Sequence, residues 1–137
     1  MKPRFVDANI FIRFITKDDP IKAEKCFRLF QEAEKRKILL VTTKSILAEV
    51  IYILSAKTLY ALPPKKIKEL LEPVIALKGW RIKWKKEFQL ALEIYAEKNI
   101  DFEDALAAAA MQAQKIETIY SYDRHFDRLS WIKRIEP

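Results

Sequence analysis

Hydrophobic residues along the chain recur with the spacings of short strands and amphipathic helices in alternation. Phe5 and Val6 lead into Asp7 and predict a first strand over residues 4–7, followed directly by a helix over 8–16. Asp18-Asp19-Pro20 marks the start of a second helix, with proline at its first position, and we expect this helix to reach about residue 37. The apolar segment 38–41 predicts the next strand.

The alternation continues through the second half of the chain. Segment 42–57 opens with two threonines suited to cap a helix, and segment 63–77 opens with two prolines that also favour a helix start. Over 80–84, apolar and basic residues alternate, which predicts a strand with one solvated face. We further expect helices over 87–98 and 102–115 and strands over 118–121 and 132–135.

Strands separated by helices require crossover connections, so the sequence predicts an α/β fold with a mainly parallel sheet and helices on both faces. The 137 residues include one glycine, Gly79, and no flexible linker, so we expect a single domain over residues 1–137. In sheets of this kind, ligands bind beyond the carboxyl ends of the strands. Functional residues are therefore expected at that edge.

Composition removes several classes of protein. A single glycine excludes a dinucleotide fingerprint and a P-loop, and one cysteine with one histidine excludes an ordinary zinc site. Cys26 is expected to pack in the core, which fits a reducing compartment. No apolar run reaches the roughly 20 residues of a membrane span, and no leader is apparent, so we expect a cytoplasmic protein. The net charge of +7 favours polyanionic partners.

Carboxylates are the chemistry that remains, and two of them occupy unusual positions in the first half of the chain. Asp7 lies at the carboxyl end of the first predicted strand, although an aspartate there also suits the cap of the following helix. Glu49 lies at the border of the apolar stripe of its helix, where pairing with a lysine is the alternative explanation.

Further acids occupy comparable positions in the second half. Asp101 and Asp104 begin a helix that is otherwise rich in alanine, and we favour a capping role for Asp101 and a ligand role for Asp104. Asp123 follows a predicted strand and also suits a cap, whereas Asp127 is expected to face solvent and only support the site. Carboxylates gathered at one sheet edge repel one another unless cations neutralise them, and oxygen ligands suit Mg²⁺ or Mn²⁺.

Four segments resemble the acidic motifs of PIN domains, in the same order along the chain. Residues 6–11 read VDANIF and resemble the opening motif, and residues 47–50 read LAEV and resemble the second. Residues 104–109, DALAAA, resemble the third, and residues 121–126, SYDRHF, resemble the fourth. Each motif is weak alone, while the ordered set covers nearly the whole chain and is specific.

This resemblance implies a three-layer α/β/α fold with a central, mainly parallel sheet. It also implies a Mg²⁺- or Mn²⁺-dependent endoribonuclease like the VapC toxins of toxin–antitoxin pairs, with an antitoxin bound near the site and a homodimer as the usual assembly. The metal-binding quartet would be Asp7, Glu49, Asp104 and Asp123. Asn9 and Ser121 fall where the family places supporting polar residues. Such a metal activates water for in-line attack on phosphorus and neutralises charge on the leaving oxygen.

Three other functions remain open from the sequence. The family also contains RNA-processing nucleases outside toxin systems, a PIN-like module can hold RNA or a protein without cutting, and a similar scaffold can carry a phosphatase. An acidic centre repels RNA, so nearby cations must attract the backbone; Arg13, Lys44 and Arg124 are candidates. For the basic residues of 81–86 we favour an ordinary solvated face, and for Trp80 and Trp84 a packing role over base stacking.

Overall fold

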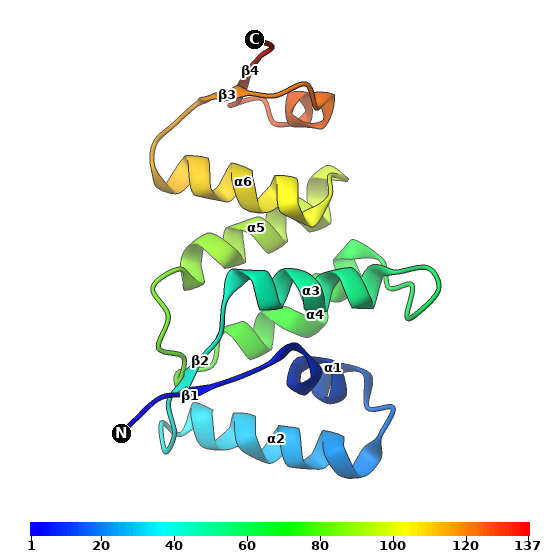
Figure 1. The fold of residues 1–137 in the computed structure, drawn as a ribbon, viewed down its shortest axis with the longest axis vertical. Helices are drawn as coiled ribbons and strands as arrows, with labels where there is room; N and C mark the ends of the chain where they lie inside the picture. The colour runs from blue at the N-terminus through cyan, green and yellow to red at the C-terminus, as the bar shows by residue number, and fades with distance from the viewer. The chain divides into compact units, whose positions relative to one another are not determined.

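The computed structural model describes residues 1–137, which form two compact units, unit 1 (Met1–Lys85) and unit 2 (Lys86–Pro137). Figure 1 shows each unit as a short pair of strands accompanied by helices, with unit 1 in blue to green and unit 2 in green to red. Each is described below by itself. A single domain over 1–137 stays a prediction from the sequence.

Unit 1 contains two parallel strands and four helices. In its sheet, Arg4 of the first strand lies opposite Leu40 of the second, and Leu40 forms one further parallel bridge, to Trp80. The predicted parallel pairing is thus present, although the strands are shorter than the sequence indicated. The elements are β1 (Arg4–Phe5), α1 (Ala8–Thr16), α2 (Pro20–Glu34), β2 (Leu40–Val41), α3 (Lys44–Ser55) and α4 (Pro64–Ile75).

The helix starts in unit 1 follow the capping signals in the sequence. Asp19 caps α2 by accepting a hydrogen bond from the Lys22 amide, with Pro20 at the first helical position. Thr43 caps α3 in the same way through the Ile46 amide. These caps satisfy amide groups that have no partner within the helix, so the starts of α2 and α3 are confirmed.

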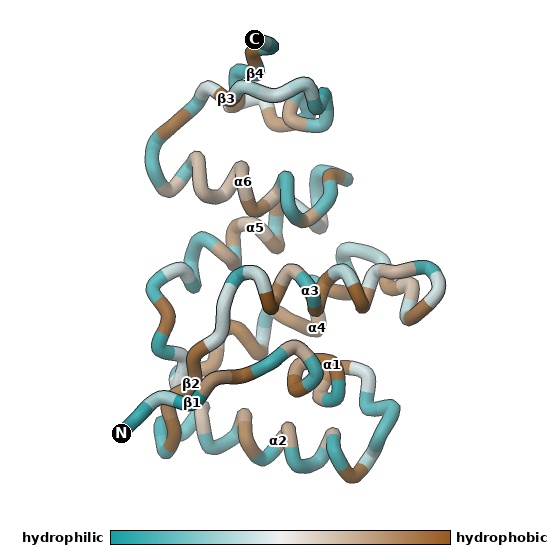
Figure 2. The backbone as a smooth tube through the Cα atoms, in the orientation of Figure 1, coloured by the Kyte–Doolittle hydropathy of each residue, from teal (hydrophilic) through white to brown (hydrophobic).

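The core of unit 1 joins an aromatic cluster to aliphatic residues of α3 and α4. Phe11 of α1 is fully buried and stacks on Trp80, with ring centroids 5.8 Å apart. The Trp80 indole N–H donates to the Val74 carbonyl oxygen, which confirms the packing role expected for this tryptophan. Leu47 and Leu71 are also fully buried. Figure 2 shows the apolar stretches of these helices in brown against teal polar segments.

The strand predicted over 80–84 is wrong beyond its first residue. Trp80 alone bridges to Leu40, residues 81–84 form no strand, and the next helix, α5 (Lys85–Lys98), begins two residues earlier than expected. The Lys85 ammonium group donates to the Leu77 carbonyl oxygen, which holds the chain at the start of α5. Burial does alternate over these residues, with Trp80 buried and Arg81 and Lys83 exposed, but no extended strand ladder accompanies it.

Unit 2 contains most of α5, followed by α6 (Phe102–Ala113), β3 (Thr118–Tyr120), the 3₁₀-helix η1 (Arg124–Arg128) and β4 (Lys133–Ile135). The strands β3 and β4 pair in parallel, with Ile119 opposite Arg134, as the predicted fold class requires. Phe102 packs against Phe88 and, edge to face, against Tyr95, which joins α6 to α5. No helix is long and apolar enough to cross a membrane.

Arg134 of β4 binds residues of η1 and of the segment after β3. Its guanidinium group makes two bonds to the Asp127 carboxylate, of 3.0 and 3.3 Å, and donates to the Ser121 carbonyl oxygen at 3.1 Å. Only 13% of the Arg134 side chain is exposed, whereas 54% of the Asp127 side chain is, and these bonds connect β4, η1 and the end of β3. Asp127 is exposed, as expected, and that it supports the site stays a prediction.

Gly79 allows the chain to pass unusually close to α2. A Cβ atom at this position would lie 2.4 Å from the Ala33 carbonyl oxygen, and the Gly79 carbonyl oxygen accepts from the Leu40 amide. We therefore expect Gly79→Ala to lower the free energy of unfolding by about 1–3 kcal/mol through backbone crowding. Urea unfolding measures the change. The exposed neighbour Lys78→Ala should change it by under about 0.5 kcal/mol, and equal effects of the two would contradict this explanation.

Candidate metal centre

Asp7 is placed by the pairing of β1 with β2. The Val6 amide donates to the Val41 carbonyl oxygen at 2.8 Å, and the buried Thr42 hydroxyl donates to the Val6 carbonyl oxygen at 2.9 Å. The chain is thus held on both sides of the peptide group that precedes Asp7. The Asp7 carboxylate accepts from the Ala8 amide at 2.8 Å and caps α1. The structure thus confirms Asp7 as a helix cap. The residue is also exposed, so the cap does not prevent its carboxylate from binding a ligand.

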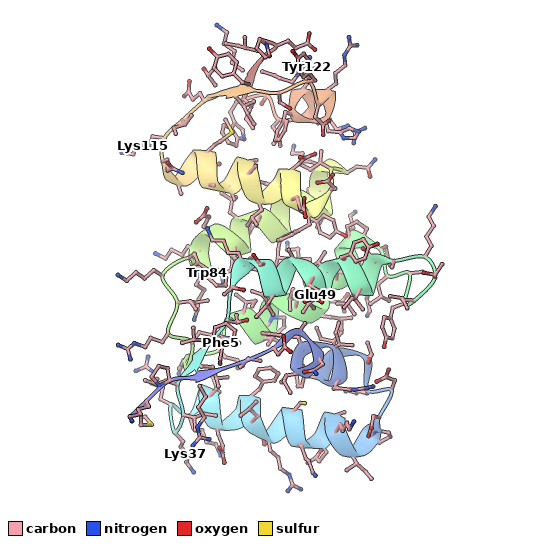
Figure 3. All side chains as sticks on the ribbon, viewed as in Figure 1. Phe5, Lys37, Glu49, Trp84, Lys115 and Tyr122 are labelled. Carbon is pink, nitrogen blue, oxygen red and sulfur yellow. The ribbon has the colours of Figure 1, made fainter.

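Asp7 lines an open pocket of about 420 Å³ in unit 1, which we call the acidic pocket. Glu49 reaches it from α3, where Figure 3 shows this residue in the middle of the helix. Asn9, the supporting residue expected from the sequence, is also in the lining. The structure therefore brings together three of the predicted site residues. The other polar lining residues are Arg13, Asp18 and Tyr60.

A hydrogen-bonded triad forms part of the acidic pocket. Asp18 accepts from the Arg13 guanidinium group at 2.9 Å and from the Tyr60 hydroxyl at 2.8 Å. Both bonds favour the ionised carboxylate, so the pKa of Asp18 lies below its ordinary value, with the Tyr60 bond as the larger cause. The triad connects the end of α1 to the loop after α3. It also fixes the Arg13 side chain at the pocket.

Asp104 and Asp123 form a second acidic group, in unit 2, which we call the carboxylate pair. The Asp101 side chain accepts from the Asp104 amide at 2.9 Å and caps α6, as predicted for Asp101. Asp104 therefore lies in the first turn of the helix, past the cap, and is free of the capping role. One of its two carboxylate oxygens, Oδ2, is buried and has no hydrogen-bond partner.

Asp123 is held in place by backbone bonds just beyond β3. Its amide donates to the Ser121 hydroxyl at 3.0 Å, and its carboxylate accepts from the His125 amide at 2.9 Å, which caps η1. The His125 Nδ1 atom lies 3.1 Å from the same carboxylate oxygen. One ligand atom from each of Asp104, Asp123 and His125 lies within 4.8 Å of the others. Such a spacing allows them to share one cation.

The carboxylate pair has opposed acidities. The pKa of Asp104 is raised to about 6, first by burial, then by hydrogen bonding with Asp123 and by the negative charges of Asp101 and Asp123. The pKa of Asp123 is lowered, first by the hydrogen bond from the His125 amide and then by that with Asp104. A proton on Asp104 satisfies the pair, since its hydroxyl can donate to the ionised Asp123. Without that proton, two negative charges face each other.

The chain combines a parallel α/β architecture with acids placed after the strands β1 and β3. That architecture is of the PIN-domain type. The family model for the PIN domain matches residues 4–132, and the chain belongs to this family. A comparison with curated proteins gives no significant match. The family has a nuclease-type fold, which makes hydrolysis of nucleic acid the general class of activity to consider.

Nucleases of this family generally use a divalent cation, and the carboxylate pair fits one. A buried oxygen without a partner, beside a second carboxylate, is the environment that a hard cation stabilises, because the cation replaces both the missing donor and the proton. Asp104 and Asp123 offer oxygen ligands, and His125 offers a nitrogen ligand that Mn²⁺ accepts more readily than Mg²⁺ does.

His125 is not among the site residues predicted from the sequence, because one histidine with one cysteine does not indicate an ordinary zinc site. Its position two residues after Asp123 is the available signal, since a turn of that length returns the side chain to the carboxylate it caps. The cap explanation for Asp123 is likewise correct without excluding a ligand role.

The carboxylate pair predicts an unusual pH dependence for the metal-free protein. The pKa of Asp104 is about 6 in the folded state and about 3.8 in an unstructured chain, so the folded state binds more protons between these values. The stability contributed by protonated Asp104 is therefore complete below about pH 4 and is lost as the pH rises through about 6. In EDTA at about pH 8, we expect Asp104→Asn to be more stable than the wild type by on the order of 1 kcal/mol, after allowing for solvent screening.

Urea unfolding at about pH 4 and about pH 8 measures this difference, which should largely vanish at the lower pH. Glu93→Gln, an exposed position in the middle of α5, is the matched control and should show no such gain. A gain for Asp104→Asn of the same size at both pH values would show that the effect is not electrostatic.

Proposed function

We propose that this protein is a divalent-metal-dependent endoribonuclease that hydrolyses RNA phosphodiesters. The observation that carries the proposal is the carboxylate pair, in which a buried Asp104 oxygen has no partner beside Asp123, in a chain of the PIN family. Two carboxylates that repel each other destabilise the metal-free protein. In a PIN-type nuclease this repulsion favours the metal-bound form, because the cation neutralises both charges.

We propose that Asp7, Glu49, Asp104 and Asp123 hold Mg²⁺ or Mn²⁺. Support comes from the order of the four acidic motifs, from the acidic pocket that contains Asp7 and Glu49, and from the carboxylate pair. Asn9 and Ser121 would be the supporting residues: Asn9 lines the acidic pocket, and the Ser121 hydroxyl accepts from the Asp123 amide. That all four acids serve one site stays a prediction from the motif order.

The chemistry supplied by Mg²⁺ or Mn²⁺ at such a site is activation of water for attack on phosphorus and neutralisation of charge on the leaving oxygen. The protein side chains have the tasks of holding and orienting. Asp123 is fixed by backbone bonds on both sides, and Asp104 is fixed within the first turn of α6. These constraints keep the ligands in position without reorganisation when substrate binds.

The motif resemblance to VapC toxins extends the proposal to the biological setting. We propose a cytoplasmic toxin that acts on RNA, is a homodimer and is neutralised by an antitoxin protein. The net charge of +7 supports a polyanionic substrate, since basic residues attract the phosphate backbone. An RNA-processing nuclease outside a toxin system would use the same residues, and the presence or absence of a neutralising partner distinguishes the two.

The cleavage test uses purified protein and a labelled panel of RNAs. We expect cleavage in Mg²⁺ or Mn²⁺, none in EDTA, and a loss of at least about 100-fold in Asp7→Asn, Asp104→Asn and Asp123→Asn, because each removes a ligand charge. Gel analysis of the products measures the rate. The matched control is Glu93→Gln, which should retain full activity.

The outcomes separate the competing functions. Equal cleavage by the wild type and all variants would reveal a contaminating nuclease and remove the proposal. Binding of RNA without cleavage, unaffected by EDTA or by Asp7→Asn, would select the non-cleaving module. Hydrolysis of a simple aryl phosphate without action on RNA would select the phosphatase.

Direct measurement of Mn²⁺ binding tests the ligand set without relying on activity. We expect calorimetric titration at about pH 8 to show Mn²⁺ binding that weakens by at least about tenfold in Asp123→Asn and also in Asp7→Asn, if both hold the same ion. Binding should also weaken below about pH 6, because the proton on Asp104 competes with the metal. Loss in Asp123→Asn with unchanged binding in Asp7→Asn would contradict a site shared by all four acids.

A further inference from the structure

A second pocket in unit 1 adjoins the acidic pocket and has the opposite charge. It measures about 350 Å³ and is lined by Asn9, Ile10, Arg13, Lys22, Lys25 and Cys26. Three of these six residues are cationic and none is acidic. We call it the basic pocket. A concave surface lined by positively charged side chains has a focused positive potential and attracts anions.

The two pockets share a wall. Asn9 and Arg13, both on α1, line the acidic pocket and the basic pocket alike. An anion bound in the basic pocket would therefore be separated from the pocket that contains Asp7 and Glu49 only by the side chains of the shared wall. A chain of regularly spaced anions can occupy the cationic side while one of its units reaches the acidic side. A polynucleotide backbone has this property.

The lysines of the basic pocket are anchored on α2. Lys22 and Lys25 are three residues apart and so lie on the same side of the helix, and both are exposed. Ala23 and Cys26, which alternate with them, are buried and hold this helix against its neighbours. The Lys22 ammonium group is 4.0 Å from the Asp19 carboxylate, a distance at which an exposed pair contributes little, so it remains available to an anion.

The Arg13 side chain is restrained at the shared wall by a hydrogen bond. Its Nη1 atom donates to Asp18, whose carboxylate is fixed in turn by Tyr60. The guanidinium group carries further N–H donors on Nη2 and Nε that this bond does not use. A planar group restrained in this way loses little conformational freedom on binding a phosphate. Cys26 also lines the pocket and is buried, so it adds no charge there.

We propose that the basic pocket binds the phosphodiester backbone of a single-stranded polynucleotide, next to the nucleotide that reaches Asp7 and Glu49. This inference rests on the proposed function, because only a nuclease substrate would need its backbone to pass from the basic pocket into the acidic pocket. Lys22 and Lys25 contact phosphate oxygens, and Arg13 bridges the two pockets. These lysines contribute affinity and position, without any role in the bond cleavage itself.

The test measures binding separately from cleavage. A fluorescein-labelled single-stranded RNA is titrated by anisotropy in EDTA, where the protein is not expected to cut. The Lys22→Gln/Lys25→Gln double variant should bind about 5- to 20-fold more weakly at 0.1 M salt, and the salt dependence of log K should fall by about 1.4, as for two lost phosphate contacts. The matched control is Lys65→Gln/Lys68→Gln on α4, which removes the same charge at the same spacing.

The outcomes either support the proposal or overturn it. Weakening confined to the Lys22/Lys25 variant, with unchanged melting temperature, supports it. Equal weakening in both double variants would mean that only net charge matters, and unchanged binding in the first would mean that the pocket is not used; both overturn it. Single-stranded DNA of the same sequence should lose affinity equally, whereas a loss confined to RNA would overturn the assignment to phosphates. Because no cleavage is required, these results stand apart from failure of the proposed nuclease activity.

Discussion

Parallel pairing of very short strands controls where the acids of each unit lie. In unit 1, the Val6 backbone is bonded to Val41 and Thr42, so the chain leaves β1 at a fixed point and Asp7 follows immediately. In unit 2, the end of β3 is bonded to β4 through the Ser121 amide, and Asp123 follows two residues later. Strands of two or three residues suffice because side-chain bonds at their ends complete the restraint.

Capping and chemistry are combined at these positions rather than opposed. Asp7 and Asp123 each accept an amide hydrogen bond at a helix start, and for Asp123 this bond lowers the pKa of the carboxylate. Asp104 differs, because Asp101 performs the capping and leaves a buried Asp104 oxygen without a donor. The local structure thus stabilises the ionised form of Asp123 and penalises ionisation of Asp104. A capping role therefore does not explain Asp104.

Cationic side chains lie next to the acids of unit 1. Repulsion between an acidic centre and a polyanion has to be offset by cations close by, and in unit 1 Arg13 stands at the boundary between the acidic and basic pockets. The Asp18–Tyr60 pair restrains it there. Charge is therefore arranged locally, on the first two helices, rather than only as the excess of basic residues over the whole chain.

The sequence by itself determined the starts of the capped helices α2, α3 and α6, the parallel α/β class and the acids to consider, because caps, periodicity and ordered motifs are local signals. It did not determine that the strand pattern from Trp80 onward is reduced to a single bridge, since side chains can alternate between buried and exposed without a strand ladder. Nor did it identify His125 as a neighbour of Asp123, or the unpartnered oxygen of Asp104. Burial, pKa and pocket lining depend on which residues fold against one another, and only the tertiary structure decided them.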